Sequence, residues 1–217
     1  MSRVSFFDNI FLSGYTKFFK GVYGRNKKLL AVSTIMFFAP LFIGAFIGYF
    51  LPHLVGSFLI AFTHQLKSQV ELTTVSIFTH NLQAALVAYI GGIIGIVPAL
   101  TLFSNGFLIG SLSGYLMNGT VHQSLSLVDV ISYILPHGIF EIPAFIIAGA
   151  AGFRLTSVVI DLINSTRGKP YISDDYRKFK DSLALLAIAV ILLVIAAIIE
   201  ANFTIPIGNY ITGLNLH

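Results

Sequence analysis

The chain has 217 residues, of which 56% are hydrophobic and only 10% are charged, and its mean hydropathy is +0.86. A water-soluble domain carries about a quarter charged residues and could not bury this much apolar surface. The apolar residues also form runs close to or above the roughly 18 to 20 that cross a hydrocarbon core. The composition therefore excludes a soluble enzyme and predicts an all-α, polytopic transmembrane bundle with about five membrane-crossing helices and amphipathic interfacial helices.

Cysteine is absent, and the net charge of +4 is unevenly distributed. Without cysteine the chain has no disulfides, thiolate nucleophiles or cysteine metal sites. Six of the 13 Lys and Arg precede the first apolar run, six lie between Arg154 and Lys180, and the last is Lys67. Cytoplasmic loops are enriched in Lys and Arg, so we expect both clusters in the cytoplasm, with an even number of crossings between them. The charges flank apolar spans instead of forming one folded face, so no nucleic acid partner is expected.

Residues 1–28 form a predicted cytoplasmic segment, in which apolar side chains recur with a helical period over residues 5–23. We expect an amphipathic helix there, on the membrane interface or against the protein's own helices. A transmembrane domain follows at residues 29–202. After its first span, residues 53–79 include Lys67 and Glu71 and suggest an external re-entrant or surface helix.

The apolar stretch 81–115 is too long for one crossing, at about 50 Å if it is wholly helical, and Pro98 and Ser104-Asn105-Gly106 interrupt it. We therefore divide it into two spans. A short external tail is predicted at residues 203–217. We therefore expect a multi-pass protein of the cell membrane, with its N-terminus in the cytoplasm and its C-terminus outside the cell. The five predicted spans lie at residues 29–51, 80–100, 103–117, 130–153 and 183–199.

Small residues recur at four-residue spacing in several of these spans. In a membrane this spacing lets two helix backbones approach closely, and packing must drive association because lipid gives no hydrophobic reward for it. The pattern predicts helix packing within one chain or an interface between copies of the chain. The residues are Gly44, Gly48, Gly106, Gly110, Gly114, Ala148 and Gly152, with a further pair at Gly91 and Gly95.

The fourth predicted span carries an imidazole and a carboxyl, His137 and Glu141, four residues apart and thus on one face of a helix. Glu141 lies about 20 Å from Arg154 at 1.5 Å per residue, hence inside the hydrocarbon. An ionised group there is costly unless it is paired, protonated or hydrated. Pro136 and Pro143 each free a backbone carbonyl that a neighbour must satisfy.

This polar pair has several interpretations. The functional interpretations are a proton or ion relay, a site for a polar group of a substrate, and a metal pair completed by His80. In the structural interpretation, His137 and Glu141 bond to each other and to freed backbone groups and so stabilise the bend of the fourth span against a neighbour. Asn81 and Asn105 either cap helices or hydrogen-bond towards this site. The sequence contains none of the familiar catalytic signatures. We therefore predict no catalytic residue, no metal site and no cofactor.

One set of motifs is more specific than the rest: Asn105-Gly106, Pro136-His137-Gly138 with Glu141, Ala148-Gly149 and Gly152-Phe153-Arg154-Leu155. In these motifs the chain resembles the stage II sporulation protein M family over residues 25–202. The resemblance implies an all-helical integral membrane protein. In spore-forming bacteria the family member belongs to a membrane complex with peptidoglycan-degrading partners that drives engulfment of the forespore. Relatives also occur in archaea and in bacteria that never sporulate, so this role is not carried over.

These observations give one leading hypothesis and two alternatives. The leading one is a non-enzymatic scaffold or subunit of a membrane complex, whose partners are the lipid bilayer, a second copy of the chain and other membrane or envelope proteins. The first alternative is a channel or transporter that uses Glu141 and His137 as a protonatable or ion site. The second is an intramembrane hydrolase or metalloenzyme with His137, Glu141 and His80. A polar cavity at Glu141 favours transport or catalysis, and glycines buried between protomers favour assembly.

Overall fold

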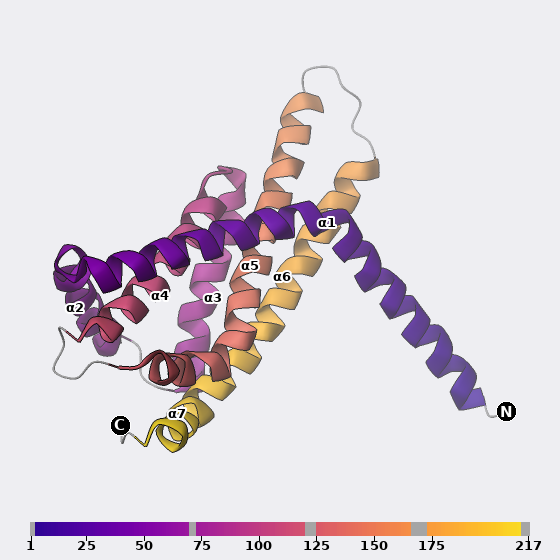
Figure 1. Cartoon of the computed structure of the whole chain (residues 1–217). Helices are drawn as coiled ribbons and strands as arrows, with labels where there is room; N and C mark the ends of the chain where they lie inside the picture. The colour runs from indigo at the N-terminus through magenta and orange to yellow at the C-terminus, as the bar shows by residue number, and fades with distance from the viewer. Residues whose placement is uncertain (1–2, 70–72, 120–124, 166–172, 214–217) are drawn as a thin grey trace.

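The computed structural model describes residues 3–69, 73–119, 125–165 and 173–213, and among them the side chains of residues 19–65, 73–119, 125–165 and 176–213. The regular elements of these residues are all helical, as predicted. In chain order they are α1 (Arg3–Phe50), α2 (Pro52–Gln69), α3 (Thr74–Ile90), the 3-10 helix η1 (Gly91–Ile93), α4 (Val97–Asn118), α5 (Leu127–Ser165), α6 (Ser173–Ile199), the π-helix η2 (Glu200–Thr204) and α7 (Ile205–Thr212) (Figure 1).

Four stretches are long and apolar enough to cross a membrane: Phe19–Phe50, Val97–Asn118, Leu127–Ser165 and Tyr176–Thr212. Large apolar side chains such as Phe42 and Ile191, 67% and 60% exposed, cover the outside of the bundle. Such a surface suits lipid, which solvates apolar groups. At 39 residues, α5 is about 58 Å long, so it extends well beyond a hydrocarbon core of about 30 Å.

The 17-residue helix α3 is shorter, yet it runs in the same direction as α5. Near its start Asn81 lies beside Glu141 of α5, and at its end Tyr89 is 3.3 Å from the Ser182 hydroxyl of α6. The turn η1 then packs on α5, where the Thr156 hydroxyl donates to the Gly92 carbonyl at 2.7 Å. Together α3 and η1 therefore run alongside α5 from Glu141 to Thr156. Four stretches of the described residues are long and apolar enough to cross a membrane, and the fifth predicted crossing stays a prediction.

Helices α5 and α6 pack through small residues. Ala144 and Ala148 of α5 meet Ala189 and Leu193 of α6, with Ala85 of α3 alongside, and all five are fully buried. Small side chains let these helices approach closely, which fixes the elements that carry the polar residues described below.

Helices α1 and α4 pack backbone to backbone through glycine. A Cβ added at Gly110 would lie 2.0 Å from the Leu41 carbonyl oxygen, and one added at Gly44 would lie 2.4 Å from the Phe107 carbonyl oxygen. Gly48, Gly106 and Gly114 face carbonyl oxygens of the opposite helix in the same way. Gly152 approaches the Ala88 carbonyl of α3. The four-residue spacing is therefore used for packing within one chain.

A network of four polar residues joins α1, α5 and α6, and we call it the basic end. Arg25 donates to both carboxylate oxygens of Asp181, at 2.7 and 2.6 Å. Arg154 donates to the Asn26 side chain and to the Arg25 carbonyl, both at 2.5 Å. Asp181 and Asn26 are buried. The two basic clusters thus meet at one end of the bundle, although which side of the membrane this end faces stays a prediction.

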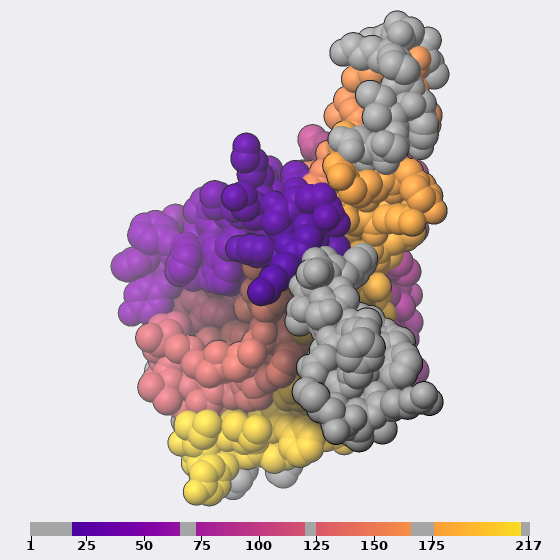
Figure 2. All heavy atoms as spheres, turned by 90° about the vertical axis from the view of Figure 1, so that its right-hand side faces the viewer, coloured from indigo at the N-terminus to yellow at the C-terminus, as the bar shows by residue number. Residues whose placement is uncertain are grey.

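Beyond the basic end, α5 and α6 continue as a two-helix hairpin, tied by an ion pair between Lys178 and Asp161. In Figure 2 this orange part rises above the body of the molecule, and the yellow C-terminal helix lies at the opposite end. The molecule therefore has a basic end with polar extensions and a second end closed by α7.

The connection between α3 and α4 differs from the predicted one. Helix α3 begins at Thr74 and ends at Ile90, and α4 begins at Val97, so the predicted boundaries at 80–100 and 103–117 are displaced. Pro98 lies in the first turn of α4, where its missing N–H was unpaired in any case. The chain reverses at Gly95, whose φ of +84° favours glycine.

Both ends of the described chain also differ from expectation. The segment 1–28 is helical from Arg3 and continuous with the first span in α1, while the side chains of residues 5–18 lie outside the described ones. The predicted tail at 203–217 forms η2 and α7 up to Thr212, and residues 214–217 lie outside the description. The buried Thr204 and Gly208 keep this stretch on the bundle, where Gly208 packs on the ring of Tyr133 and the Tyr133 hydroxyl donates to Asn209 at 2.7 Å.

Candidate functional site

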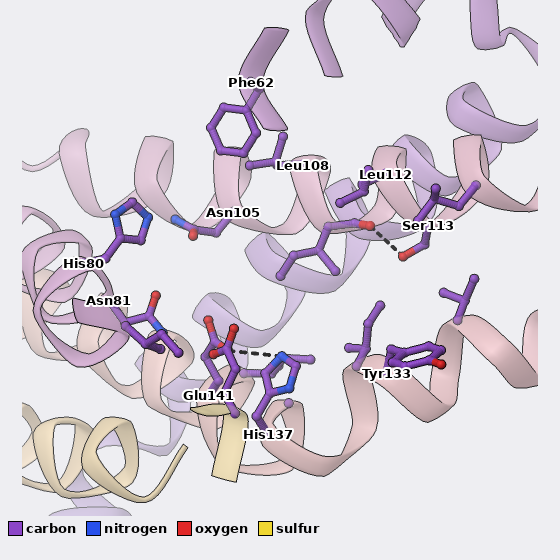
Figure 3. Close-up of a pocket in the computed structure, with 18 of the residues that line it drawn as sticks. Phe62, His80, Asn81, Asn105, Leu108, Leu112, Ser113, Tyr133, His137 and Glu141 are labelled. Carbon is purple, nitrogen blue, oxygen red and sulfur yellow. Dashed lines mark hydrogen bonds and ion pairs between the residues drawn. The ribbon is translucent and has the colours of Figure 1, made fainter. Parts of the chain in front are cut away.

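A cavity of about 440 Å³ lies between α3, α4, α5 and the junction of α6 with η2, with Phe62 of α2 at its edge. Most of its wall is apolar. Its polar side chains come from three different helices and from η2, and several of them point into the same space (Figure 3). These polar residues are His80, Asn81, Asn105, Ser113, Tyr133, His137, Glu141 and Glu200.

Three of these side chains form a tight group. His137 Nε2 lies 3.6 Å from Glu141 Oε2, and the two side chains are only 15% and 16% exposed. Glu200 joins them, because one nitrogen or oxygen atom of each of the three residues lies within 4.8 Å of the other two. We call this group the carboxyl–histidine group; it is the only set of three His, Cys, Asp or Glu with this spacing among the described residues.

Thr204 contacts the ring nitrogen of His137 that faces away from Glu141. His137 Nδ1 lies 3.1 Å from the Thr204 hydroxyl oxygen, and this oxygen lies 3.4 Å from the Ile199 carbonyl. The contact holds the imidazole ring so that Nε2 is the nitrogen that faces Glu141.

Irregular helix geometry brings these residues together. Pro136 and Pro143 lie inside α5, which changes direction near them (Figure 1). On the opposite wall, the π-helix η2 begins at Glu200 and ends at Thr204, so both residues of this widened turn face His137. Such π turns occur frequently at functional sites.

The predicted polar residues share this cavity but differ in their contacts. Asn81 is 8% exposed and lines the cavity beside the Glu141 carboxyl. Asn105 donates to the Thr101 carbonyl at 2.8 Å and faces the cavity from α4. His80 is exposed and lies across the cavity in Figure 3, outside the carboxyl–histidine group. A metal pair completed by His80 is therefore not what the fold assembles.

Glu200 and Thr204 were absent from the sequence-predicted site. Glu200 directly follows the predicted span at residues 183–199, and Thr204 lies in the predicted tail at residues 203–217. A signal was present, because Glu200 interrupts an apolar run that continues to Ile211. A carboxyl inside an apolar run indicates a functional site, and this argument applies to Glu200 as it does to Glu141.

The site lacks a matching positive charge. None of the described residues that line the cavity is Lys or Arg. Arg154 is 13 residues from Glu141 on the same helix, about 20 Å away along its axis. Two ionised carboxylates this close repel each other strongly in apolar surroundings. The arrangement therefore suits a bound cation or proton between the three side chains.

Residues 30–205 match the family described as stage II sporulation protein M, and this stretch contains every residue that lines the cavity. The chain belongs to this family. Among similar proteins is an uncharacterised one from Methanocaldococcus jannaschii, 37% identical over 137 residues, which are 63% of this chain and 73% of that protein. A second uncharacterised protein of the same organism is 29% identical over 135 residues, 62% of this chain and 56% of that protein. No solved structure matches this member of the stage II sporulation protein M family.

Proposed function

We propose that this protein binds an ion in the cavity beside Glu141 and passes it through the bundle, as a channel or transporter. The observation that carries the proposal is the cavity itself, with the carboxyl–histidine group at its wall. Ionisable residues inside membrane helices are rare, and in transport proteins they mark ion pathways.

The helices around the cavity support this function. The π turn η2 is a break in helical geometry, and its first residue, Glu200, lines the cavity. In transporters, ion sites lie where membrane helices are interrupted and irregular backbone faces a cavity. The cavity groups are also of the kinds that bind cations, namely carboxyls, imidazoles and amide oxygens.

The two other hypotheses gain less support. The intramembrane hydrolase required His137, Glu141 and His80 at one bound metal or water, but His80 lies outside the group; we therefore propose a non-enzymatic role. The scaffold hypothesis drew on glycines available to a second copy, but these glycines contact α1, α3 or α4 of the same chain. Membership of a larger complex, with a second copy or other envelope proteins, stays a prediction.

The test is ion flux in liposomes that contain the purified full chain. Dyes for H⁺, K⁺, Ca²⁺, Mn²⁺ and Zn²⁺ inside the vesicles report entry of each ion. We expect flux of at least one cation above that of empty vesicles, and Glu141→Gln to reduce it by about tenfold or more, because the amide removes a charge that pairs with the ion.

Asp129→Asn is the matched control, since it makes the same change on the same helix outside the cavity. Asp129 is half-buried and caps the first turn of α5 by accepting from the Ser126 amide at 2.8 Å, which an asparagine oxygen also does. Flux of this variant should equal that of the unmodified chain. Vesicles with the unmodified chain that admit no tested cation faster than empty ones would contradict the proposed function.

A further inference from the structure

We propose that His137, Glu141 and Glu200 bind a divalent transition-metal ion of the zinc class. This inference rests on the proposed ion site and names its ligand. Its basis is the geometry of the carboxyl–histidine group, one imidazole nitrogen and two carboxylate oxygens on α5 and η2.

The spacing suits such an ion. Zinc binds imidazole nitrogen at about 2.0 to 2.1 Å and carboxylate oxygen at about 2.0 to 2.2 Å, so neighbouring ligand atoms in a tetrahedral site lie about 3.3 to 3.6 Å apart. His137 Nε2 and Glu141 Oε2 are 3.6 Å apart, and the atoms of the group are all within 4.8 Å of one another. Changes of about 1 Å in side-chain position, well within rotamer freedom, would complete the coordination geometry.

The surrounding hydrogen bonds favour a metal in the same way. A ligating histidine usually donates its second ring N–H to a neighbour, which fixes the ring and its tautomer. His137 Nδ1 contacts the Thr204 hydroxyl at 3.1 Å, and its Nε2 is the nitrogen that faces the carboxyls. One of the three ligands therefore already has the kind of supporting contact that metal ligands have.

The ligand types distinguish this ion from other cations. Calcium requires about 6 to 8 oxygen ligands, and magnesium keeps several waters in an octahedral site. One imidazole with two carboxylates suits zinc, manganese, iron or cobalt. Three protein ligands also leave a fourth position open towards the cavity, as in sites where a ligand exchanges and unlike the closed four-ligand sites of structural zinc.

The experiment titrates Co²⁺, a spectroscopic substitute for zinc, into the full chain in detergent after treatment with a chelator. Visible absorption reports the coordination of Co²⁺, and Zn²⁺ is then added to displace it. We expect one Co²⁺ per chain, displaced by Zn²⁺, and a loss of affinity of 100-fold or more in Glu200→Gln and His137→Gln. Thr204→Val should weaken binding by about 10-fold, because it removes a contact that orients the ligand.

Two controls make the outcome specific. His80→Gln changes an imidazole that lines the cavity outside the group, and Asp129→Asn changes a carboxyl outside the cavity; both should bind Co²⁺ like the unmodified chain. Size-exclusion chromatography confirms that each variant is folded. The inference is wrong if the unmodified chain binds no Co²⁺, or if Glu200→Gln and His137→Gln bind it with unchanged affinity.

The flux measurement separates this inference from the proposed function. Co²⁺ binding at these residues in a protein that moves no ion would retain the metal site and overturn transport. Flux of protons or monovalent ions through a chain that binds no Co²⁺ would retain transport and overturn the metal site.

Discussion

At the scale of single residues, the polar side chains of the basic end are held by partners on other helices. Asp181 is the clearest case, because its side chain is 4% exposed and both of its oxygens accept from Arg25. A buried carboxylate left without its partner is strongly destabilising, whereas an exposed ion pair contributes little. The basic end should therefore contribute to stability through Asp181.

We expect Arg25→Ala to lower the free energy of unfolding by about 1 to 3 kcal/mol, less than for a fully buried pair because the Arg25 side chain is 37% exposed. Lys27→Ala is the control, since Lys27 is an exposed basic residue of the same helix, and its effect should stay within about 0.5 kcal/mol. Thermal unfolding in detergent gives both values. Equal midpoints for the two variants would mean that Asp181 does not depend on Arg25.

At the scale of helices, α1 and α4 pack closely because glycines without side chains line their contact. Each glycine of this contact leaves room for a carbonyl of the opposite helix, which brings the two backbones closer than any larger residue allows. A Cβ at such a position must push the helices apart, whereas a Cβ at a glycine facing open space has no such effect.

Gly110→Ala and Gly24→Ala should therefore change stability in opposite directions. The first places a Cβ 2.0 Å from the Leu41 carbonyl oxygen and should destabilise the fold by about 1 to 3 kcal/mol. A Cβ at Gly24, in the middle of α1, has no other atom within 4 Å. Gly24→Ala should therefore stabilise the fold by about 0.5 to 1 kcal/mol, because alanine has a higher helix propensity than glycine. Thermal unfolding of the pair tests this, and destabilisation by both changes would contradict it.

At the scale of the whole molecule, the bundle has two ends of different chemistry. The basic end brings together Arg25, Arg154 and Asp181 from α1, α5 and α6, and the cavity lies towards the other end, where Tyr133 of its wall donates to Asn209 of α7. The enrichment of basic residues in cytoplasmic loops predicts that the basic end faces the cytoplasm and α7 the outside.

Labelling of single cysteines tests this orientation, and the chain suits it because it contains no cysteine of its own. In intact cells, a membrane-impermeant maleimide should modify Tyr210→Cys, a site on α7 that is 91% exposed. It should modify Lys27→Cys only after the membrane is permeabilised. The reverse pattern would invert the topology, and labelling of both from outside would contradict the five predicted crossings.

The sequence predicted the helical bundle because long apolar runs have few alternatives to crossing a membrane, whereas the predicted fifth crossing is not among the four long apolar stretches of the fold. It also singled out His137 and Glu141, since their unusual chemistry is visible within five residues. Glu200 escaped this reasoning, because it is 59 residues from Glu141 and only the packing of α6 on α5 and the π turn bring them together. The pairing of Arg25 with Asp181 escaped it for the same reason, as 156 residues separate them.

The glycines show a different limit of sequence reasoning. Their spacing predicts close contact between helices, but a spacing carries no information on which helix is the partner. In the fold, Gly106, Gly110 and Gly114 meet α1, which precedes them by about 70 residues. The same pattern would have served a contact between two copies of the chain equally well.

The network at the basic end has a consequence for the distant cavity. It connects α1 with α5 and α6, and the small residues between α5 and α6 keep those two helices in register. His137 and Glu141 extend from α5 and Glu200 from the end of α6, so their mutual spacing is set when the chain folds. An arriving ion then meets a preorganised site, and little conformational entropy is lost on binding. Loss of the contact between Arg25 and Asp181, about 28 Å along α6 from Glu200, would weaken ion binding in the cavity without changing a residue that binds the ion.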